Sequence, residues 1–231
     1  MKLTKSLFVS AVLFLSATGA QAAGFVQNGN YLTVQLKQHQ NYGPSQIRLQ
    51  VVSDRIIRVQ ATAEQSFRNK QSLIIVPQKG KANYKVEEQG DDLIITTAAM
   101  RAVLNEATGQ ITFYDLKDQV LLKEVAQGGK TFKPFTVPDR EIGVDIAKVP
   151  EAQKHGWSWR ALFDSPDNEA FYGLGQHQSE ELNMKGKNED LFQYNTKVSV
   201  PFVISNKNYG ILWDSYSYSR WGNPDDYLQL N

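Results

Sequence analysis

Hydrophobic and more polar side chains alternate along most of the chain from Asn30 onward. Leu32, Val34 and Leu36 each lie between more polar neighbours, which is the pattern of a strand with one buried face. The same alternation runs through residues 46–52. Further strands are predicted at residues 55–62, 72–76, 84–87, 92–97, 99–105, 111–115 and 120–123.

Short segments rich in turn residues, such as Gln89-Gly90-Asp91, separate these strands at intervals of about 8 to 12 residues. The best helical candidate after the first 22 residues, residues 150–154, makes one turn at most. Prolines make residues 132–159 less regular, so we expect this portion to run along a sheet edge or between sheets. An aromatic strand is predicted at residues 156–163. The whole pattern predicts an all-β sandwich or barrel in a single domain.

The last quarter of the chain combines a glycine-containing motif, a long polar loop and a hairpin. The motif is Phe171-Tyr172-Gly173-Leu174-Gly175-Gln176, and the loop is residues 183–195. Strands at residues 198–205 and 209–214 flank the turn Asn206-Lys207-Asn208 and predict the hairpin. A polar loop of this length between strands is more often a binding loop than a plain connection.

Residues 1–22 have the pattern of a secretory signal peptide. Lys2 and Lys5 begin it, an apolar run follows over residues 7–15, and Ala20-Gln21-Ala22 resembles a signal peptidase site. The apolar run is shorter than the roughly 20 residues that span a bilayer. We therefore expect cleavage before Ala23 and export to a bacterial periplasm or beyond the cell.

Composition narrows the range of partners. The chain has no cysteine and a net charge of +1, and removing Lys2 and Lys5 leaves 23 basic against 24 acidic side chains. No basic run interleaved with aromatics suggests a nucleic acid, and no basic amphipathic helix suggests a membrane surface. A neutral ligand fits this charge balance best.

Catalytic motifs are scarce. Glu180-Glu181 and Asp225-Asp226 are adjacent acidic doublets that we interpret as solvated loop charge rather than a glycosidase pair. The three histidines, His39, His155 and His177, lack the spacing of a metal site, although His177 with Glu180 resembles an acid–base pair. No phosphate loop or dinucleotide fingerprint is present, so we expect no cofactor and no metal.

Aromatic residues are crowded into the last third of the chain. An aromatic ring packs on the C–H face of a sugar while nearby amides and hydroxyls bind its oxygens. We expect Trp157, Trp159 and Trp213 to lie in the sandwich core, because they occur in apolar strands. Tyr194, Tyr218 and Trp221 occur in polar context, where sugar contact and packing remain equally open.

These late motifs resemble the N-terminal domain of glycoside hydrolase family 31. The aromatic-Gly-Leu-Gly motif at Phe171, the strand Val200-Pro201-Phe202-Val203-Ile204-Ser205 and the segment Asn208-Tyr209-Gly210-Ile211-Leu212-Trp213-Asp214 occur in the family's order. Asp54-Arg55-Ile56-Ile57-Arg58-Val59 is similar to an early strand of the same domain. Lys185-Gly186-Lys187-Asn188 and Gln193-Tyr194-Asn195-Thr196-Lys197 resemble bacterial α-xylosidases that act on xyloglucan oligosaccharides.

The resemblance implies a galactose-mutarotase-like β-sandwich (a supersandwich) over residues 23–231 that packs on its own catalytic (β/α)₈ barrel. In the family, the catalytic aspartates of a retaining mechanism belong to that barrel, whose strand–helix alternation is absent from these 231 residues. We therefore assign no catalytic residue and expect this chain alone to be inactive. The resemblance also implies that the loop of residues 183–195 helps to shape the sugar subsites, with Gln176, Lys187, Asn188 and Tyr194 as contacts.

Two alternatives differ in class from this interpretation. The chain could be a free-standing carbohydrate-binding sandwich that presents Tyr218 and Trp221 to glycans without catalysis. It could also be a mutarotase-type epimerase, which its few scattered histidines disfavour. A domain that docks on a barrel should expose apolar surface when it is isolated, whereas a free-standing module should not.

Overall fold

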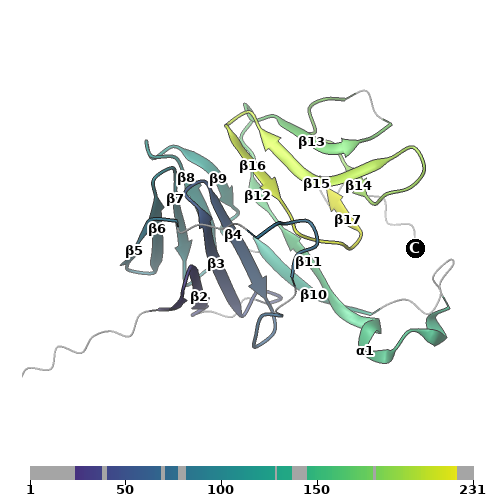
Figure 1. The fold of residues 1–231 in the computed structure, drawn as a ribbon, viewed down its shortest axis with the longest axis horizontal. Coiled ribbons are helices and arrows are strands. Elements are labelled where there is room, and N and C mark those ends of the chain that lie inside the picture. Colours follow the sequence, from purple (N-terminus) through teal and green to yellow (C-terminus); the bar gives the residue numbers. More distant parts are fainter. Residues whose placement is uncertain are drawn as a thin grey trace, which may run out of the picture.

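The computed structural model describes residues 24–37, 41–68, 71–77, 82–127, 129–136, 145–178 and 181–222. Within these ranges the chain is almost entirely β-structure, as its alternating pattern predicts (Figure 1). The short helical segments are a 3₁₀ turn, η1 (Ile146–Lys148), and one α-turn, α1 (Glu151–Lys154), the latter where a single turn is predicted. No helix in the described part of the chain is both long enough and apolar enough to cross a membrane.

Two antiparallel sheets form a sandwich from the strands of residues 25–124 together with the short strand at residues 163–164. The first sheet has the strand order β1 (Phe25–Asn28), β2 (Tyr31–Gln35), β3 (Gln46–Ser53), β4 (Ile56–Thr62). The second has the order β12 (Phe163–Asp164), β9 (Val120–Glu124), β8 (Ile111–Tyr114), β7 (Arg101–Asn105), β6 (Asp92–Thr97), β5 (Tyr84–Gln89). The predicted alternation places the apolar side chains between the sheets.

The core of this sandwich comes from alternate positions on facing strands. Leu32, Ile47 and Leu49 of the first sheet are fully buried, and so are Leu93 and Ile95 of the second. A strand directs successive side chains to opposite faces, so burying every second residue packs one face while the other remains solvated. Each such leucine or isoleucine contributes roughly 1.5–3 kcal/mol through burial.

A two-stranded ribbon departs from the expectation for residues 132–159. Residues 130–136, which contain Pro134, form β10 (Lys130–Thr136), and the predicted aromatic strand at residues 156–163 is present as β11 (His155–Ala161). The two strands pair in continuous antiparallel register. Pro134 lies opposite Trp157 in β11, and among the described strands β10 pairs with β11 alone. Proline is tolerated in such an edge strand because its missing N–H is not needed on the edge without a partner strand. The ribbon runs between the two parts of the molecule, with α1 at its far end (Figure 1).

The last part of the chain forms a second, smaller packed unit. It contains a sheet of β13 (Phe171–Gln176), β15 (Val198–Ser205) and β16 (Tyr209–Leu212), and a pair of β14 (Glu189–Leu191) with β17 (Ser219–Trp221). The predicted hairpin is confirmed as β15 and β16 around residues 206–208. Phe171, Leu174, Met184, Leu191 and Val203 form its buried core, and Trp213 and Trp221 pack against them.

The predicted strand at residues 72–76 is wrong. The Ser72 hydroxyl accepts the amides of Ile74 and Ile75, and the amide of Leu73 donates to Tyr216. These backbone groups are therefore bound to side chains rather than to a neighbouring strand. The segment instead serves as a contact between the first sandwich and the C-terminal unit.

Tyr209 and Ser205 both donate to a buried carboxylate beside the turn of the β15–β16 hairpin. Their hydroxyls lie 2.7 and 2.6 Å from Oε1 of Glu169, which is 3% exposed. Burial, helped by the hydrogen bond to Glu169, raises the pKa of Tyr209 far above its ordinary value. The folded protein therefore holds this phenolic proton more tightly than the unfolded chain does.

Alkaline unfolding should report this difference. The stabilisation is complete below the ordinary tyrosine pKa of about 10 and is lost as the pH rises above it. We expect Tyr209→Phe to lower the free energy of unfolding by about 1 kcal/mol near neutral pH and to flatten its fall above pH ~10. Urea denaturation across this range measures both effects, and Tyr172→Phe is the control for loss of an exposed hydroxyl. An unchanged alkaline slope in Tyr209→Phe would contradict the assignment.

Candidate functional site

The Gly-Leu-Gly motif of β13 determines how the loop that follows it begins. Gly173, Leu174 and Gly175 all have positive φ, at 132°, 70° and 102°, and the register with β15 shifts between the two glycines. A Cβ on Gly175 would lie 2.1 Å from the carbonyl oxygen of Val198, so only glycine fits there. The irregularity turns Leu174 into the core, leaves Gln176 exposed, and directs the His177 side chain beneath the loop.

Beneath the loop lies an ionic cluster of three side chains. His177 Nδ1 lies 3.1 Å and Lys197 Nζ lies 3.2 Å from Oε2 of Glu189. The side chains of His177, Lys197 and Glu189 are only 6%, 9% and 16% exposed. His177 Nε2 lies 2.8 Å from the carbonyl oxygen of Leu174, and because a carbonyl can only accept, Nε2 carries a proton. The cluster therefore connects the start, middle and end of the segment from 177 to 197.

The four residues predicted to contact sugar are distributed around this cluster. Gln176 is exposed and pairs with Val198, next to Lys197, which forms a bridge with Tyr194. These contacts bring Gln176 and Tyr194 to one side of the loop. Lys187 and Asn188 lie on the other side, where their atoms approach Gly222.

These four side chains differ in how far each is free to contact a ligand. Lys187 forms an ion pair with Glu181, so its ammonium already has a partner. Tyr194 is 49% exposed, and its ring lies 5.0 Å from that of Phe192. Of the four, Tyr194 offers an aromatic face to solvent.

The acidic and histidine residues considered as acid–base pairs from the sequence either have other partners or lie outside the described residues. His177 faces Glu189, twelve residues away, whereas Glu180 lies outside the described residues, as do Asp225-Asp226 and His39. Glu181 pairs with Lys187, which agrees with the interpretation of its doublet as loop charge. His155 pairs with Glu151 on the far end of the ribbon. No group of three histidine or acidic side chains within the described ranges could hold a metal ion.

Two of the tryptophans expected in the core are not there. Trp157 and Trp159 are 43% and 50% exposed, because β10 and β11 form a ribbon with no second layer over this face among the described strands. Trp213 is packed against the second core, as expected. Trp221 stacks on Trp213 and donates from Nε1 to the carbonyl oxygen of Met184, so it is a packing residue. Tyr218, in contrast, is 53% exposed.

Hydrogen bonds hold Tyr218 in place beside Phe192. Its hydroxyl donates to Asp190 at 2.5 Å and accepts from Arg220 Nε at 2.8 Å. Burial and the bond to Asp190 raise the pKa of Tyr218 above its ordinary value. The Phe192 and Tyr218 rings lie 5.9 Å apart.

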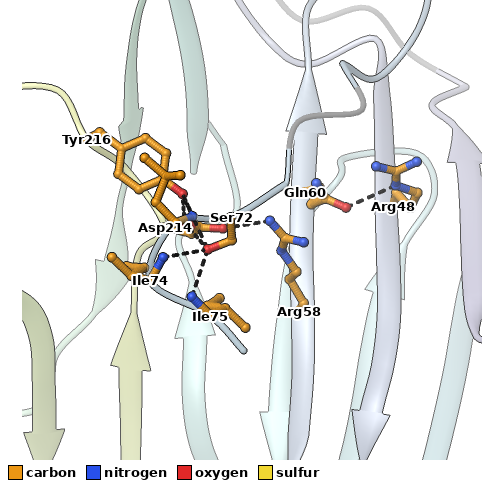
Figure 2. Close-up of polar contacts among 9 residues, drawn as sticks. Arg48, Arg58, Gln60, Ser72, Ile74, Ile75, Asp214 and Tyr216 are labelled. Atoms are coloured by element: carbon orange, nitrogen blue, oxygen red, sulfur yellow. Dashed lines mark hydrogen bonds and ion pairs between the residues drawn. The ribbon is translucent and has the colours of Figure 1, made fainter. Parts of the chain in front are cut away.

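A polar junction ties the C-terminal unit to the first sandwich (Figure 2). Asp214, just after β16, forms an ion pair with Arg58 of β4 at 2.7 Å and accepts from Ser72 and Tyr216, each at 2.8 Å. In Figure 2, Asp214 lies between Arg58 and Tyr216, and Ser72 lies against it. The sequence showed Arg58 only as an ordinary strand residue, because its partner is 156 positions away.

Three carboxylates near the loop, within the part of the chain that the structure describes, are engaged by neighbouring side chains. Glu189 forms an ion pair with Lys197 and lies 3.1 Å from His177 Nδ1, Asp190 binds Tyr218 and Arg220, and Asp214 binds Arg58. These contacts orient the side chains around the loop. The arrangement therefore suits recognition of a neutral ligand by aromatic faces and hydroxyls.

Comparison with protein families gives one match over most of the chain. Residues 46–221 match the model of the glycosyl hydrolase 31 N-terminal galactose mutarotase-like domain. An α-xylosidase from Saccharolobus solfataricus is 25% identical over 185 residues, covering 76% of this chain and 23% of that protein. An uncharacterised family 31 glucosidase from Pseudescherichia vulneris is 26% identical over 178 residues, covering 73% of this chain and 32% of that protein. The chain spans less than a third of either relative.

Solved structures agree with this match. The family 31 α-xylosidase from Xanthomonas citri superposes with a TM-score of 0.73 at 36% identity, over 86% of this chain and 20% of that one. A family 31 α-xylosidase from a soil metagenome, complexed with xylose, gives a TM-score of 0.63 at 25% identity, over 85% of this chain and 28% of that one. The all-β architecture described above is that of the matching domain.

Proposed function

The chain belongs to glycosyl hydrolase family 31 and corresponds to the family's N-terminal galactose mutarotase-like domain. On that premise we propose that it is the N-terminal domain of an α-xylosidase. The parent enzyme would release α-xylosyl residues from the non-reducing ends of xyloglucan oligosaccharides. The domain would pack against a catalytic domain and shape its sugar subsites, without catalytic residues of its own. The three α-xylosidases among the similar proteins described above support an α-xylosyl substrate.

An exposed apolar face carries the docking part of this proposal. Phe202 and Leu212 are directly opposed across β15 and β16, and Ile204 is opposed to Tyr172 across β15 and β13. These side chains and Val200 are between 37% and 49% exposed. A continuous apolar face on one side of a sheet is typical of a surface that another domain covers. A free-standing module would be expected to carry polar side chains there.

Within this proposal the loop residues Gln176, Lys187, Asn188 and Tyr194 contact the oligosaccharide. Tyr194 has the strongest support, because its half-exposed ring lies beside Phe192. Lys187 would need to exchange Glu181 for a sugar hydroxyl. The buried cluster of His177, Glu189 and Lys197 would hold the loop in place.

The direct test is activity of the chain expressed together with the coding sequence that follows the Asn231 codon. We expect that product to hydrolyse aryl α-xyloside and to release xylose from xyloglucan heptasaccharide, and the 231-residue chain to do neither. Release of glucose from aryl α-glucoside without xylose release would overturn the α-xylosidase assignment. Absence of any downstream open frame would overturn the docking proposal for this chain.

Charges placed on the exposed face should separate docking from folding. We expect Phe202→Glu with Ile204→Lys to change the stability of the 231-residue chain by less than about 1 kcal/mol, because both side chains are partly solvated, at 37% and 49% exposed. The same pair should reduce self-association of this chain in light scattering. In the longer product it should lower the unfolding midpoint measured by calorimetry.

The control for this experiment is Val26→Glu, which changes an exposed strand residue on the first sheet. It should leave the midpoint of the longer product unchanged. Equal effects of the two changes would show that the β13–β15–β16 face has no special role.

Export is a separate proposal, because residues 1–22 lie outside the described residues. We expect N-terminal sequencing of protein secreted by a bacterial host to begin at Ala23. An intact Met1 in the periplasmic fraction would contradict a cleaved signal peptide.

A further inference from the structure

A cleft opens beside the second core, separate from the apolar face described above. It has a volume of about 220 Å³ and lies between the segment at residues 191–193, the start of β15 and residues 213–219. Phe192, Trp213, Tyr216 and Tyr218 contribute aromatic side chains to its lining. Four serines, at positions 199, 215, 217 and 219, contribute hydroxyls, and Gln193 contributes an amide.

The lining has the chemistry of a site for a neutral polyhydroxylated ligand. None of its residues carries a charge at neutral pH. Aromatic faces pack on the C–H surfaces of a pyranose ring, and serine hydroxyls and an amide can exchange hydrogen bonds with its oxygens. A phosphate or carboxylate would find no cation in this lining to offset its desolvation.

The two tyrosines of the cleft are fixed before any ligand arrives. The Tyr216 hydroxyl accepts the Leu73 amide at 2.5 Å and donates to Asp214 at 2.8 Å, and Figure 2 shows Tyr216 beside Asp214 and Ser72. The Tyr218 hydroxyl is held by Asp190 and Arg220. With the hydroxyls already bound, each side chain has its ring held in one position. A preformed aromatic wall loses little conformational entropy on binding.

The period-two geometry of β15 keeps this cleft apart from the apolar face. Ser199 and Pro201 line the cleft, whereas Val200 and Phe202 lie exposed on the opposite side of the strand. Successive residues of a strand point to opposite faces. Covering the apolar face would therefore leave the cleft open.

We propose that this cleft binds one neutral pyranose residue of an oligosaccharide. Its lining contains none of the contacts Gln176, Lys187, Asn188 and Tyr194, although it adjoins Tyr194 through Phe192. Its volume is below the roughly 300–1,000 Å³ of pockets for drug-sized ligands, which suits a single ring. The choice of xylose as the first probe rests on the proposed function, whereas the existence of the site does not. Such a site would let the domain hold one branch of the substrate while another is processed.

The test is titration of the 231-residue chain with methyl α-D-xylopyranoside and, separately, with glucuronate. Saturation-transfer NMR on the sugar and tryptophan fluorescence report binding, because Trp213 lines the cleft. We expect a saturable signal with the neutral xyloside and none with the charged glucuronate. Absence of a saturable signal with the xyloside would overturn the proposal.

Two variants locate the binding within the molecule. Tyr218→Ala should weaken xyloside binding at least tenfold, whereas Tyr218→Phe, which keeps the ring, should remain within a few-fold of the original chain. Tyr172→Ala removes a comparably exposed tyrosine from the opposite face and should leave binding unchanged. Equal losses in Tyr218→Ala and Tyr172→Ala would overturn the assignment to the cleft. Circular dichroism confirms that each variant is folded.

Failure of this proposal can be distinguished from failure of the proposed function. Sugar binding is measured on the 231-residue chain, whereas α-xylosidase activity is measured on the longer product. α-Xylosidase activity without sugar binding would overturn only the proposed sugar site in the cleft. Sugar binding without α-xylosidase activity would overturn the proposed function and leave the sugar site supported.

Discussion

Replacing Gly175 with alanine is expected to lower the free energy of unfolding by about 3 kcal/mol, the largest single effect we anticipate outside the hydrophobic cores. At φ of 102° an L side chain is strained, and its Cβ would lie 2.1 Å from the carbonyl oxygen of Val198. Because the obstacle is backbone, it cannot swing aside as a side chain would. Relief requires β13 and β15 to separate, which would open the second core at Leu174.

Urea denaturation followed by tryptophan fluorescence measures this change, since Trp213 and Trp221 report on the second core. Gly156→Ala is the matched control. Gly156 is also an exposed strand glycine, but nothing lies within 4 Å of a Cβ placed on it. We expect the control to alter stability by less than about 0.5 kcal/mol. Similar midpoints for the two variants would show that the Gly-Leu-Gly motif has no steric role.

Replacing Glu189 with glutamine is expected to lower the free energy of unfolding by about 2 kcal/mol and to loosen the segment from 177 to 197. The change leaves the Lys197 ammonium, whose side chain is only 9% exposed, without a countercharge. Removing one partner of a buried ion pair is costly because the remaining charge stays desolvated. Hydrogen exchange of the loop amides should accelerate together with the fall in stability.

The exposed pair of Glu181 and Lys187 supplies the control. Both side chains are 44% exposed, so Glu181→Gln should cost less than about 0.5 kcal/mol. A second variant, Glu189→Gln with Lys197→Met, removes the stranded charge and should recover part of the loss. If Glu181→Gln were as damaging as Glu189→Gln, the buried cluster would not be what orders the loop.

Local pattern was enough to predict most strands of the first sandwich. Ile47, Leu49 and Val51 alternate with polar residues, and this alternation alone specifies which side of β3 is buried. The prediction failed where side chains compete for the backbone, as Ser72 does for the amides of Ile74 and Ile75. It found β11 as the aromatic strand at residues 156–163 but missed β10, because a proline that excludes a central strand is compatible with an edge.

The candidate site was only partly accessible to such reasoning. Tyr194 and Tyr218 were singled out by their polar context, and both are exposed. Trp157 and Trp159 were wrongly predicted to lie in the core. The sequence pattern of an apolar strand is the same whether or not a second layer of structure covers it. The ionic cluster was missed because the partner of His177 is Glu189, across the loop, rather than the nearby Glu180.

The sequence by itself determined the all-β class, the order of the late motifs and, through the resemblance those motifs carry, the family. Strand periodicity and glycine-dependent turns are properties of neighbouring residues, so they can be recognised without knowing what lies across the sheet. Only the tertiary structure decided which charges meet, such as Arg58 with Asp214, and which aromatic faces remain open. Those outcomes depend on contacts between residues far apart in the chain, and the energy of burying a charge or a ring exists only once the chain has folded around it.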